Sequence, residues 1–185
     1  MRKKIIITAI AVAFNASIML AQNATITVGG ESMYPAKNII ENAVNSKDHT
    51  TLVAAVKAAG LVETLQGKGP FTVLAPTNDA FENLPEGTVE TLLKPENKSK
   101  LTGILTYHVL AGKFDFNTIE KAIKDGKGSV SMKTVAGGSL TFMMNGSHNI
   151  SVKDENGGVA NISTYDVYQS NGIIHVLDKV LLPKM

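Results

Sequence analysis

The chain has 185 residues and a formal net charge of +2, a size that suits one domain and a charge that gives no support to nucleic-acid binding. It contains no cysteine, so disulfides, thiolate metal sites, cysteine nucleophiles and a lipidated N-terminal cysteine are excluded. The stability of the fold must therefore come from an apolar core.

The first 21 residues have the three parts of a secretory signal peptide. Basic residues at positions 2–4 precede a mostly apolar run over residues 5–20, and Ala21 is suited to the cleavage site. A transmembrane anchor is the alternative, but the strongly apolar stretch is short for a span and Asn15 interrupts it. We therefore expect a bacterial protein that is secreted to the periplasm or outside the cell, with cleavage near Ala21. Loss of the leader changes the formal net charge from +2 to −1.

The rest of the chain divides into an arm and a domain. Residues 22–37 are polar and rich in glycine, which predicts an N-terminal arm that packs in part through Met33 and Tyr34. Residues 38–185 contain no internal repeat, low-complexity tract or linker, so we expect them to form one domain.

Apolar residues at helical spacing predict helices in the first half of this domain. Asp48 is expected to cap the second of these helices, and Thr77 or Asn78 the helix that follows the first strand. We expect helices over residues 39–45, 49–59, 61–65, 79–84, 89–93, 95–105 and 116–124.

Strand-like runs dominate the second half of the domain. Glycine-containing pairs at 137–138, 145–146 and 156–157 predict hairpin turns between several of them. Strands are expected over residues 71–75, 107–110, 130–135, 139–144, 149–153, 159–163 and 173–182. Helices followed by strands predict an α+β fold with a mostly antiparallel sheet.

Three motifs follow one another along the domain. Residues 69–81 read Gly-Pro-Phe-Thr-Val-Leu-Ala-Pro-Thr-Asn-Asp-Ala-Phe, residues 107–109 read Tyr-His-Val, and residues 171–183 read Asn-Gly-Ile-Ile-His-Val-Leu-Asp-Lys-Val-Leu-Leu-Pro. Together they resemble the signature blocks of the fasciclin-type domain family, and the resemblance covers nearly the whole mature chain. The residues of these blocks that we expect to build the fold are Thr72, Ala75, Pro76, Thr77, Asn78, Asp79, Phe81, Asn171, Gly172, His175 and Asp178.

The resemblance implies a wedge-shaped β-sandwich with a helical layer, and an extracellular adhesion or binding role. In matrix members of the family the Tyr-His region has been linked to receptor adhesion, so Tyr107 and His108 become candidate contact residues. Their apolar surroundings favour burial instead, and both interpretations stay open. Met33 and Tyr34 in the arm are a second candidate surface, because apolar side chains on an exposed arm often dock.

The chain lacks the patterns of a metal or catalytic site. Its histidines are not spaced as metal ligands, and it has neither an H-E-x-x-H motif nor a G-x-S-x-G elbow, so we assign no metal, cofactor or catalytic residue. Asp154 and Glu155 could contact calcium, but the full ligand spacing is missing and a solvated turn is expected. The four histidines are His49, His108, His148 and His175.

The leading hypothesis is a secreted, non-catalytic binding module that contacts cell-surface or extracellular matrix components, either protein or polysaccharide. One alternative is a hydrolase acting on extracellular polymers, which would need exposed carboxylates in a cleft. Another is a small-ligand carrier, which would need an apolar cavity.

Export predicts a processed N-terminus. Mass spectrometry of the native protein should find a chain that begins near Gln22, because the leader is removed during translocation. An intact Met1 in the soluble cell fraction would refute this interpretation.

Overall fold

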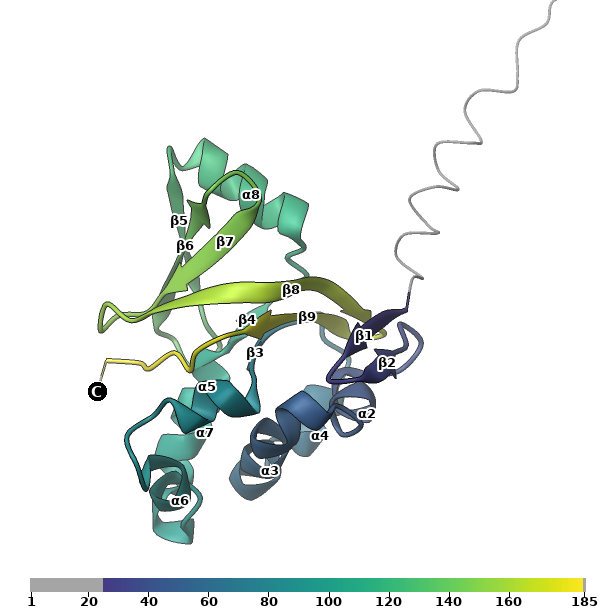
Figure 1. Ribbon diagram of the computed structural model, residues 1–185, viewed down its shortest axis with the longest axis vertical. Coiled ribbons are helices and arrows are strands. Elements are labelled where there is room, and N and C mark those ends of the chain that lie inside the picture. The colour runs from purple at the N-terminus through teal and green to yellow at the C-terminus, as the bar shows by residue number, and fades with distance from the viewer. Residues whose placement is uncertain (1–24, 185) are drawn as a thin grey trace, which may run out of the picture.

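The computed structural model describes residues 25–184, so the predicted signal peptide over residues 1–21 and the start of the arm lie outside the described residues. Figure 1 shows most helices on one side of a large sheet, with α8 packed at its opposite end. The helices are α2 (Ile39–Ala43), α3 (Thr50–Ala59), α4 (Val62–Gln66), α5 (Asn78–Glu82), α6 (Thr88–Leu92), α7 (Lys98–Tyr107) and α8 (Phe116–Asp125), with short 3-10 turns η1 (Lys47–His49) and η2 (Pro95–Asn97).

The main sheet has seven strands in the order β4-β3-β9-β8-β7-β6-β5. Only β3 and β9 pair in parallel, and the other neighbours are antiparallel. The strands are β3 (Phe71–Pro76), β4 (Val109–Ala111), β5 (Ser129–Lys133), β6 (Ser139–Asn145), β7 (Asn149–Lys153), β8 (Val159–Gln169) and β9 (Gly172–Leu177). The expected α+β class, with helices mainly in the N-terminal half, is confirmed.

Strand β8 gives the sheet its wedge shape. Its first residues pair with β7, and the stretch from Ile162 to Gln169 pairs with β9. Two register shifts interrupt this second pairing, and Asp166 adopts a positive φ of 56° there. Such bulges bend a strand and raise its twist, so the sheet divides into two limbs that diverge in Figure 1. The sequence predicted only the first part of this strand.

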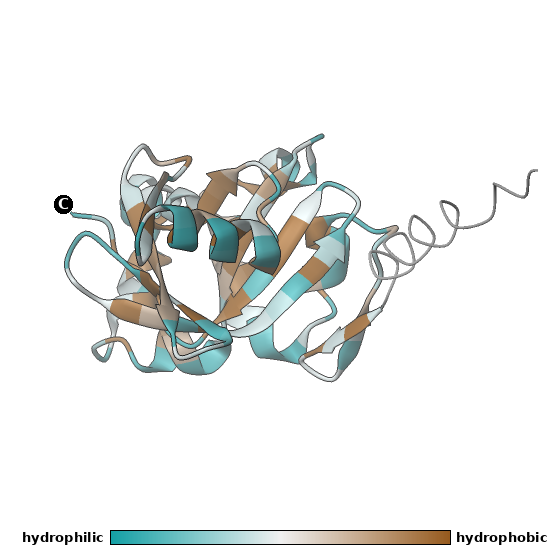
Figure 2. Ribbon diagram, turned by 90° about the horizontal axis from the view of Figure 1, so that it is seen from above, coloured by the Kyte–Doolittle hydropathy of each residue, from teal (hydrophilic) through white to brown (hydrophobic). Residues whose placement is uncertain are grey.

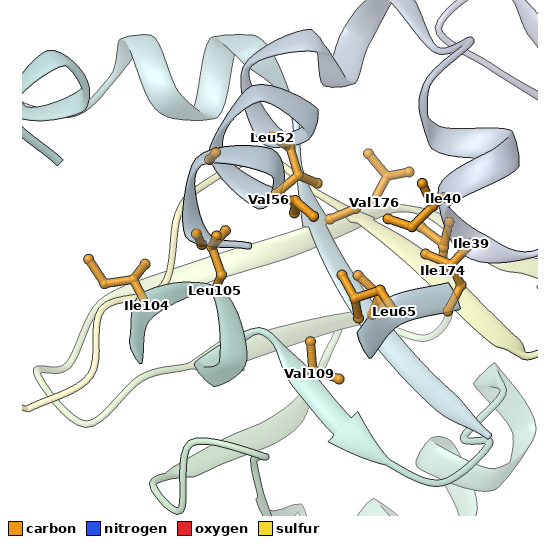
Figure 3. Close-up of a cluster of buried hydrophobic side chains, with 14 of the residues drawn as sticks. Ile39, Ile40, Leu52, Val56, Leu65, Ile104, Leu105, Val109, Ile174 and Val176 are labelled. Carbon is orange, nitrogen blue, oxygen red and sulfur yellow. The ribbon is translucent and has the colours of Figure 1, made fainter. Parts of the chain in front are cut away.

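Two apolar clusters fill the angles of the wedge. One lies between the N-terminal helices and the limb of β4, β3, β9 and β8, and it includes the side chains drawn in Figure 3. The other lies between α8 and the limb of β5 to β8, where Ile119 and Ile123 of α8 are fully buried. Figure 2 shows the hydrophilic outer face of α8 above apolar strand residues. The helices thus turn an apolar face toward the sheet, and the strands turn alternate residues toward the helices.

The helix α5 begins as predicted, but α3 does not. Thr77 caps α5 by accepting a hydrogen bond from the Ala80 backbone N–H at 3.3 Å. Asp48 was expected to cap α3, and this was wrong because it lies within the 3-10 turn η1 that precedes the helix. The Asn78 side chain instead accepts from the Thr51 N–H at 3.0 Å, so a distant residue satisfies the helix start.

The predicted strand over residues 107–110 was also wrong at its start. Tyr107 is the last residue of α7 and His108 is the C-cap of that helix. Strand β4 begins only at Val109. His108 lies four residues after Ile104, on the same apolar face of α7. A hydrogen bond joins the His108 Nδ1 to the Ile104 carbonyl oxygen. A short apolar run does not distinguish the last helical turn from a strand.

The N-terminal arm forms a hairpin that the sequence analysis did not foresee. Strands β1 (Ile26–Val28) and β2 (Glu31–Met33) pair in antiparallel fashion across Gly29 and Gly30, whose φ values are 62° and 76°. Two successive positive φ values define the tight turn that suits hairpins. A Cβ on Gly29 would lie 2.4 Å from the Ser46 Oγ, so only glycine fits where the hairpin meets η1.

A buried amide joins the helical layer to the sheet. The Asn171 Oδ1 accepts from the Ile39 N–H at 3.0 Å, and its Nδ2 donates to the Leu65 and Gly67 carbonyls at 2.8 Å each. Asn171 therefore ties the start of α2 and the end of α4 to the start of β9. The next residue, Gly172, has no room for a Cβ, which would lie 2.1 Å from the Phe71 carbonyl oxygen.

Replacing this amide should destabilise the whole domain. We expect Asn171→Ala to lower the free energy of unfolding by about 3 kcal/mol, because it leaves the buried Ile39 N–H and Leu65 carbonyl and the half-buried Gly67 carbonyl without this partner. Urea denaturation measures the loss. The control Asn45→Ala removes one exposed amide bond to the Glu41 carbonyl and should cost less than about 1 kcal/mol. Equal losses in the two variants would contradict the role of Asn171.

Candidate functional site

The four residues proposed from the sequence as contact residues do not form one surface. Tyr107 is 0% exposed, and Met33 and His108 are each 3% exposed. Tyr34 is 47% exposed and lies just after β2. In this fold a partner could touch the side chain of Tyr34 without rearrangement, whereas the other three side chains lie beneath the surface.

Tyr107 joins two hairpins of the sheet. Its hydroxyl donates to the Ser139 carbonyl at 2.9 Å and accepts from the Glu155 N–H at 3.1 Å. A Cβ on Gly138 would lie 2.8 Å from the Tyr107 ring, so the chain passes closely over it. Burial raises the pKa of the Tyr107 hydroxyl, which stays neutral and able to donate.

His108 holds the C-terminal segment against α7. Its Nδ1 lies 2.9 Å from the Ile104 carbonyl oxygen, and its Nε2 accepts from the Leu181 N–H at 3.0 Å. The two partners therefore select the neutral tautomer with the proton on Nδ1. Burial lowers the pKa of His108 to about 4, although the Ile104 carbonyl and the Asp154 carboxylate favour the charged ring.

The other polar residues of the signature blocks bind backbone in the same way. The Thr72 hydroxyl donates to the Gly112 carbonyl at 2.8 Å and accepts from the Phe114 N–H at 2.9 Å. His175 uses both ring nitrogens, one with the Phe114 carbonyl at 2.8 Å and the other with the Asp166 N–H at 3.3 Å. Burial lowers the pKa of His175, so its ring stays neutral as well.

The end of β9 is held by a carboxylate. Asp178 accepts from the backbone and side-chain N–H groups of Asn161 at 2.7 and 2.9 Å. Of the remaining signature residues, Ala75, Pro76 and Phe81 are buried and Asp79 is exposed.

The expected solvated turn is confirmed for residues 155–158, which are exposed, but not for Asp154. Asp154 is buried, and its carboxylate accepts from the N–H groups of Asn156, Gly158 and Leu182 at 2.9, 2.7 and 3.0 Å. These bonds fasten the C-terminal segment to the β7–β8 hairpin. Nowhere in residues 25–184 do three or more His, Asp or Glu side chains gather as a metal site would require.

An apolar cavity of about 80 Å³ lies between the N-terminal helices and the sheet. Met33 and His108, far apart in the sequence, both line it. Figure 3 shows the buried apolar cluster at this place, and most of its labelled side chains, which come from α2, α3, α4, α7 and the strands beneath, line the cavity. The cavity meets the one structural requirement that the sequence analysis set for a small-ligand carrier.

His49 is a residue of this site that the sequence analysis missed. It lines the cavity, is 3% exposed, and its Nε2 has no hydrogen-bond partner among the described residues. Its Nδ1 lies 2.8 Å from the Ser46 Oγ. Burial lowers the pKa of His49, although the Ala75 carbonyl and the Asp48 carboxylate favour the charged ring. The sequence held no signal for this role, because the wall residues come together only in the fold.

Within residues 25–184, no helix has the length and apolar character needed to cross a membrane.

Known proteins provide an independent comparison. A family model described as the fasciclin domain matches residues 47–183 of this chain. Protein sll1483 of Synechocystis sp. is 49% identical over 152 residues, which cover 81% of this chain and 76% of that protein. Periostin of Homo sapiens is 31% identical over 165 residues, which cover 89% of this chain but 18% of periostin. Immunogenic protein MPB70 of Mycobacterium bovis is 35% identical over 146 residues, 76% of this chain and 66% of that protein.

A solved structure shows the same fold. It is the FAS1 domain pair from the insect cell adhesion molecule fasciclin I, with a TM-score of 0.71 and 19% sequence identity. The match covers 80% of this chain and 52% of that chain, as expected when one domain is compared with a pair.

The buried histidines predict a loss of stability in acid. The ordinary pKa of histidine is about 6.5, so the unfolded chain takes up protons below that pH while folded His108 stays neutral down to about 4. The stabilisation from neutral His108, about 3 kcal/mol, is therefore present above pH 6.5 and lost as the pH falls to about 4. Lowered pKa values at His49 and His175 act in the same direction.

Urea unfolding at several pH values between 7 and 4 tests this linkage. Between pH 7 and pH 4, the free energy of unfolding of His108→Gln should fall by roughly 3 kcal/mol less than that of the unsubstituted protein. The exposed His148 provides the matched control, and His148→Gln should leave the dependence unchanged. An unaltered slope in the His108 variant would contradict the assigned tautomer and its hydrogen bonds.

Proposed function

Because the chain belongs to the fasciclin domain family, we propose that it is a secreted binding module that contacts extracellular protein or polysaccharide without catalysing a reaction. In this proposal residues 1–21 are a leader removed near Ala21, residues 22–37 an arm, and residues 38–185 the fasciclin-type domain. The solved structure that shares its fold comes from an insect cell adhesion molecule, which agrees with a contact role.

The observation that carries the proposal is the internal use of the signature polar groups. The side chains of Thr72, Asn171 and Asp178 are bonded to groups within the domain. A side chain whose donors and acceptors are engaged in the fold is poorly placed to recognise a substrate. The motif that defines the family therefore explains the architecture, and the surface outside the motif is left to bind partners.

The geometry of His108 and His175 argues against either of them serving as the general base of the hydrolase alternative. A general base must present a free nitrogen to the proton that it accepts. In His108 and His175 both ring nitrogens already have partners inside the domain, and burial lowers both pKa values. Neither ring can accept a substrate proton without breaking the bonds that hold the sheet to its neighbouring segments.

Tyr34 is the residue we assign to partner contact. It is exposed, and the Lys37 ammonium lies 5.0 Å from the centre of its ring. Two hydrogen bonds to the side chain of the buried Asn42 fix the Tyr34 backbone. The Tyr34 N–H donates to the Asn42 Oδ1 at 3.0 Å, and the Asn42 Nδ2 donates to the Tyr34 carbonyl at 2.9 Å. An aromatic ring on a fixed backbone offers a partner a large contact area at little entropic cost. This side chain suits a protein hot spot or a sugar face.

Pull-down from extracellular material and a glycan array, both with the exported protein, test the proposal. We expect at least one retained partner at micromolar concentration. Tyr34→Ser should weaken that binding by at least about five-fold, as for an aromatic residue at a hot spot. The control Val159→Ser removes another exposed apolar side chain, at the start of β8, and should bind as the unsubstituted protein does. No retained partner in either format would contradict the binding role.

A further inference from the structure

We propose that the apolar cavity between the helices and the sheet binds a neutral, apolar small molecule of about six carbon atoms that carries one hydrogen-bond acceptor. This site goes beyond the surface contact proposed above and does not depend on it. Three features of the cavity support the proposal: its apolar walls, its size and the His49 ring in its wall.

The walls are made of apolar side chains from both layers of the domain. Helix α2 contributes Ile39 and Ile40, α3 contributes Leu52 and Val56, and β9 contributes Ile174. Figure 3 shows these side chains pointing toward one another from separate elements. Water inside such walls would lose hydrogen bonds, so an apolar occupant is favoured over solvent.

The size of the cavity sets the size of its occupant. A cavity needs about 10–15 Å³ to hold one water molecule, which is close to the size of a methylene group. The 80 Å³ available therefore accommodates at least about five such groups. The exposed residues Lys57, Thr64 and Val135 also line the cavity, so its opening lies between α3, α4 and the loop after β5.

His49 supplies the polar group of the site. We assign the Ser46 hydroxyl as the donor to the His49 Nδ1. In this tautomer the ring proton lies on Nε2, and it is the one proton of the Ser46–His49 pair that the bond between them does not use. That N–H is buried in the cavity wall and makes no hydrogen bond of good geometry among the described residues. The Ala75 carbonyl on the same wall favours a proton on the ring but does not complete such a bond. A buried donor without an acceptor is costly, and an oxygen atom of a ligand would satisfy it.

The same environment selects a neutral ligand. Burial lowers the pKa of His49, so the ring carries no charge that could pair with a carboxylate inside the cavity. Moving a carboxylate from water to this apolar site would cost more than one hydrogen bond returns. A ketone or an alcohol combines an apolar body with one acceptor and carries no such cost.

The test compares three probes of equal chain length: 2-hexanone, hexane and hexanoate. Each is titrated into the full exported protein and followed by methyl NMR. We expect 2-hexanone to bind about three- to ten-fold more tightly than hexane, the gain of one neutral hydrogen bond, and hexanoate to bind more weakly than the ketone. The shifted methyl signals should be those of Met33, Ile39, Ile40 and Ile174, which line the cavity.

The protein contains its own control for location. Ile119, Ile123 and Ile150 are equally buried but belong to the second core, so their methyl signals should not move. His49→Phe should abolish the preference for the ketone over hexane, whereas His49→Gln, which keeps a donor, should retain part of it. Unshifted cavity methyls at millimolar ketone, equal affinity for ketone and hexane, or tightest binding of hexanoate would each overturn the proposal without any variant.

Discussion

The parallel pairing of β3 with β9 is the constraint on which the rest of this fold depends. It joins segments separated by about a hundred residues, from Phe71 opposite Gly172 to Pro76 opposite Leu177. Parallel strands are buried on both faces and no short turn joins them, so the segments at each end of the pair are held by other contacts. At the start of β9 the Asn171 side chain binds the backbone of α2 and α4, and just beyond its end Asp178 binds Asn161 of β8. The helical layer and the second limb are both fastened at these two points.

This constraint explains why the most recognisable part of the sequence is also the least exposed. A polar side chain that closes a buried strand end must have a specific shape and bonding pattern, which makes it stand out as a motif. His108 and Thr72 bind the backbone of neighbouring segments in the same way, so the signature residues stabilise the fold. The groups that we propose for contact with other molecules lie elsewhere: Tyr34 just after β2 and His49 in the cavity wall.

The sequence predicted what depends on local pattern and missed what depends on tertiary partners. Helical spacing and glycine turns located nearly every element, and the three motifs identified the fold. Tyr107 was placed in a strand because the four-residue run from Tyr107 to Leu110 is too short to show a helical or strand period. Asp48 looked like a cap, yet the actual acceptor for α3 is Asn78, 27 residues beyond Thr51. The cavity and the unpaired His49 arise only when α2, α3 and β3 meet, so no local signal reports them.

The signature side chains stabilise the fold by binding backbone groups within the domain, and they do not contact partners. Native-state hydrogen exchange tests this role directly on three amides that donate to side chains: Ile39 to Asn171, Phe114 to Thr72, and Leu181 to His108. If these bonds hold the core, the three amides exchange only through global unfolding, as slowly as the amides of β3 and β9. Exchange of all three by local opening, far faster than the β3–β9 amides, would contradict the account.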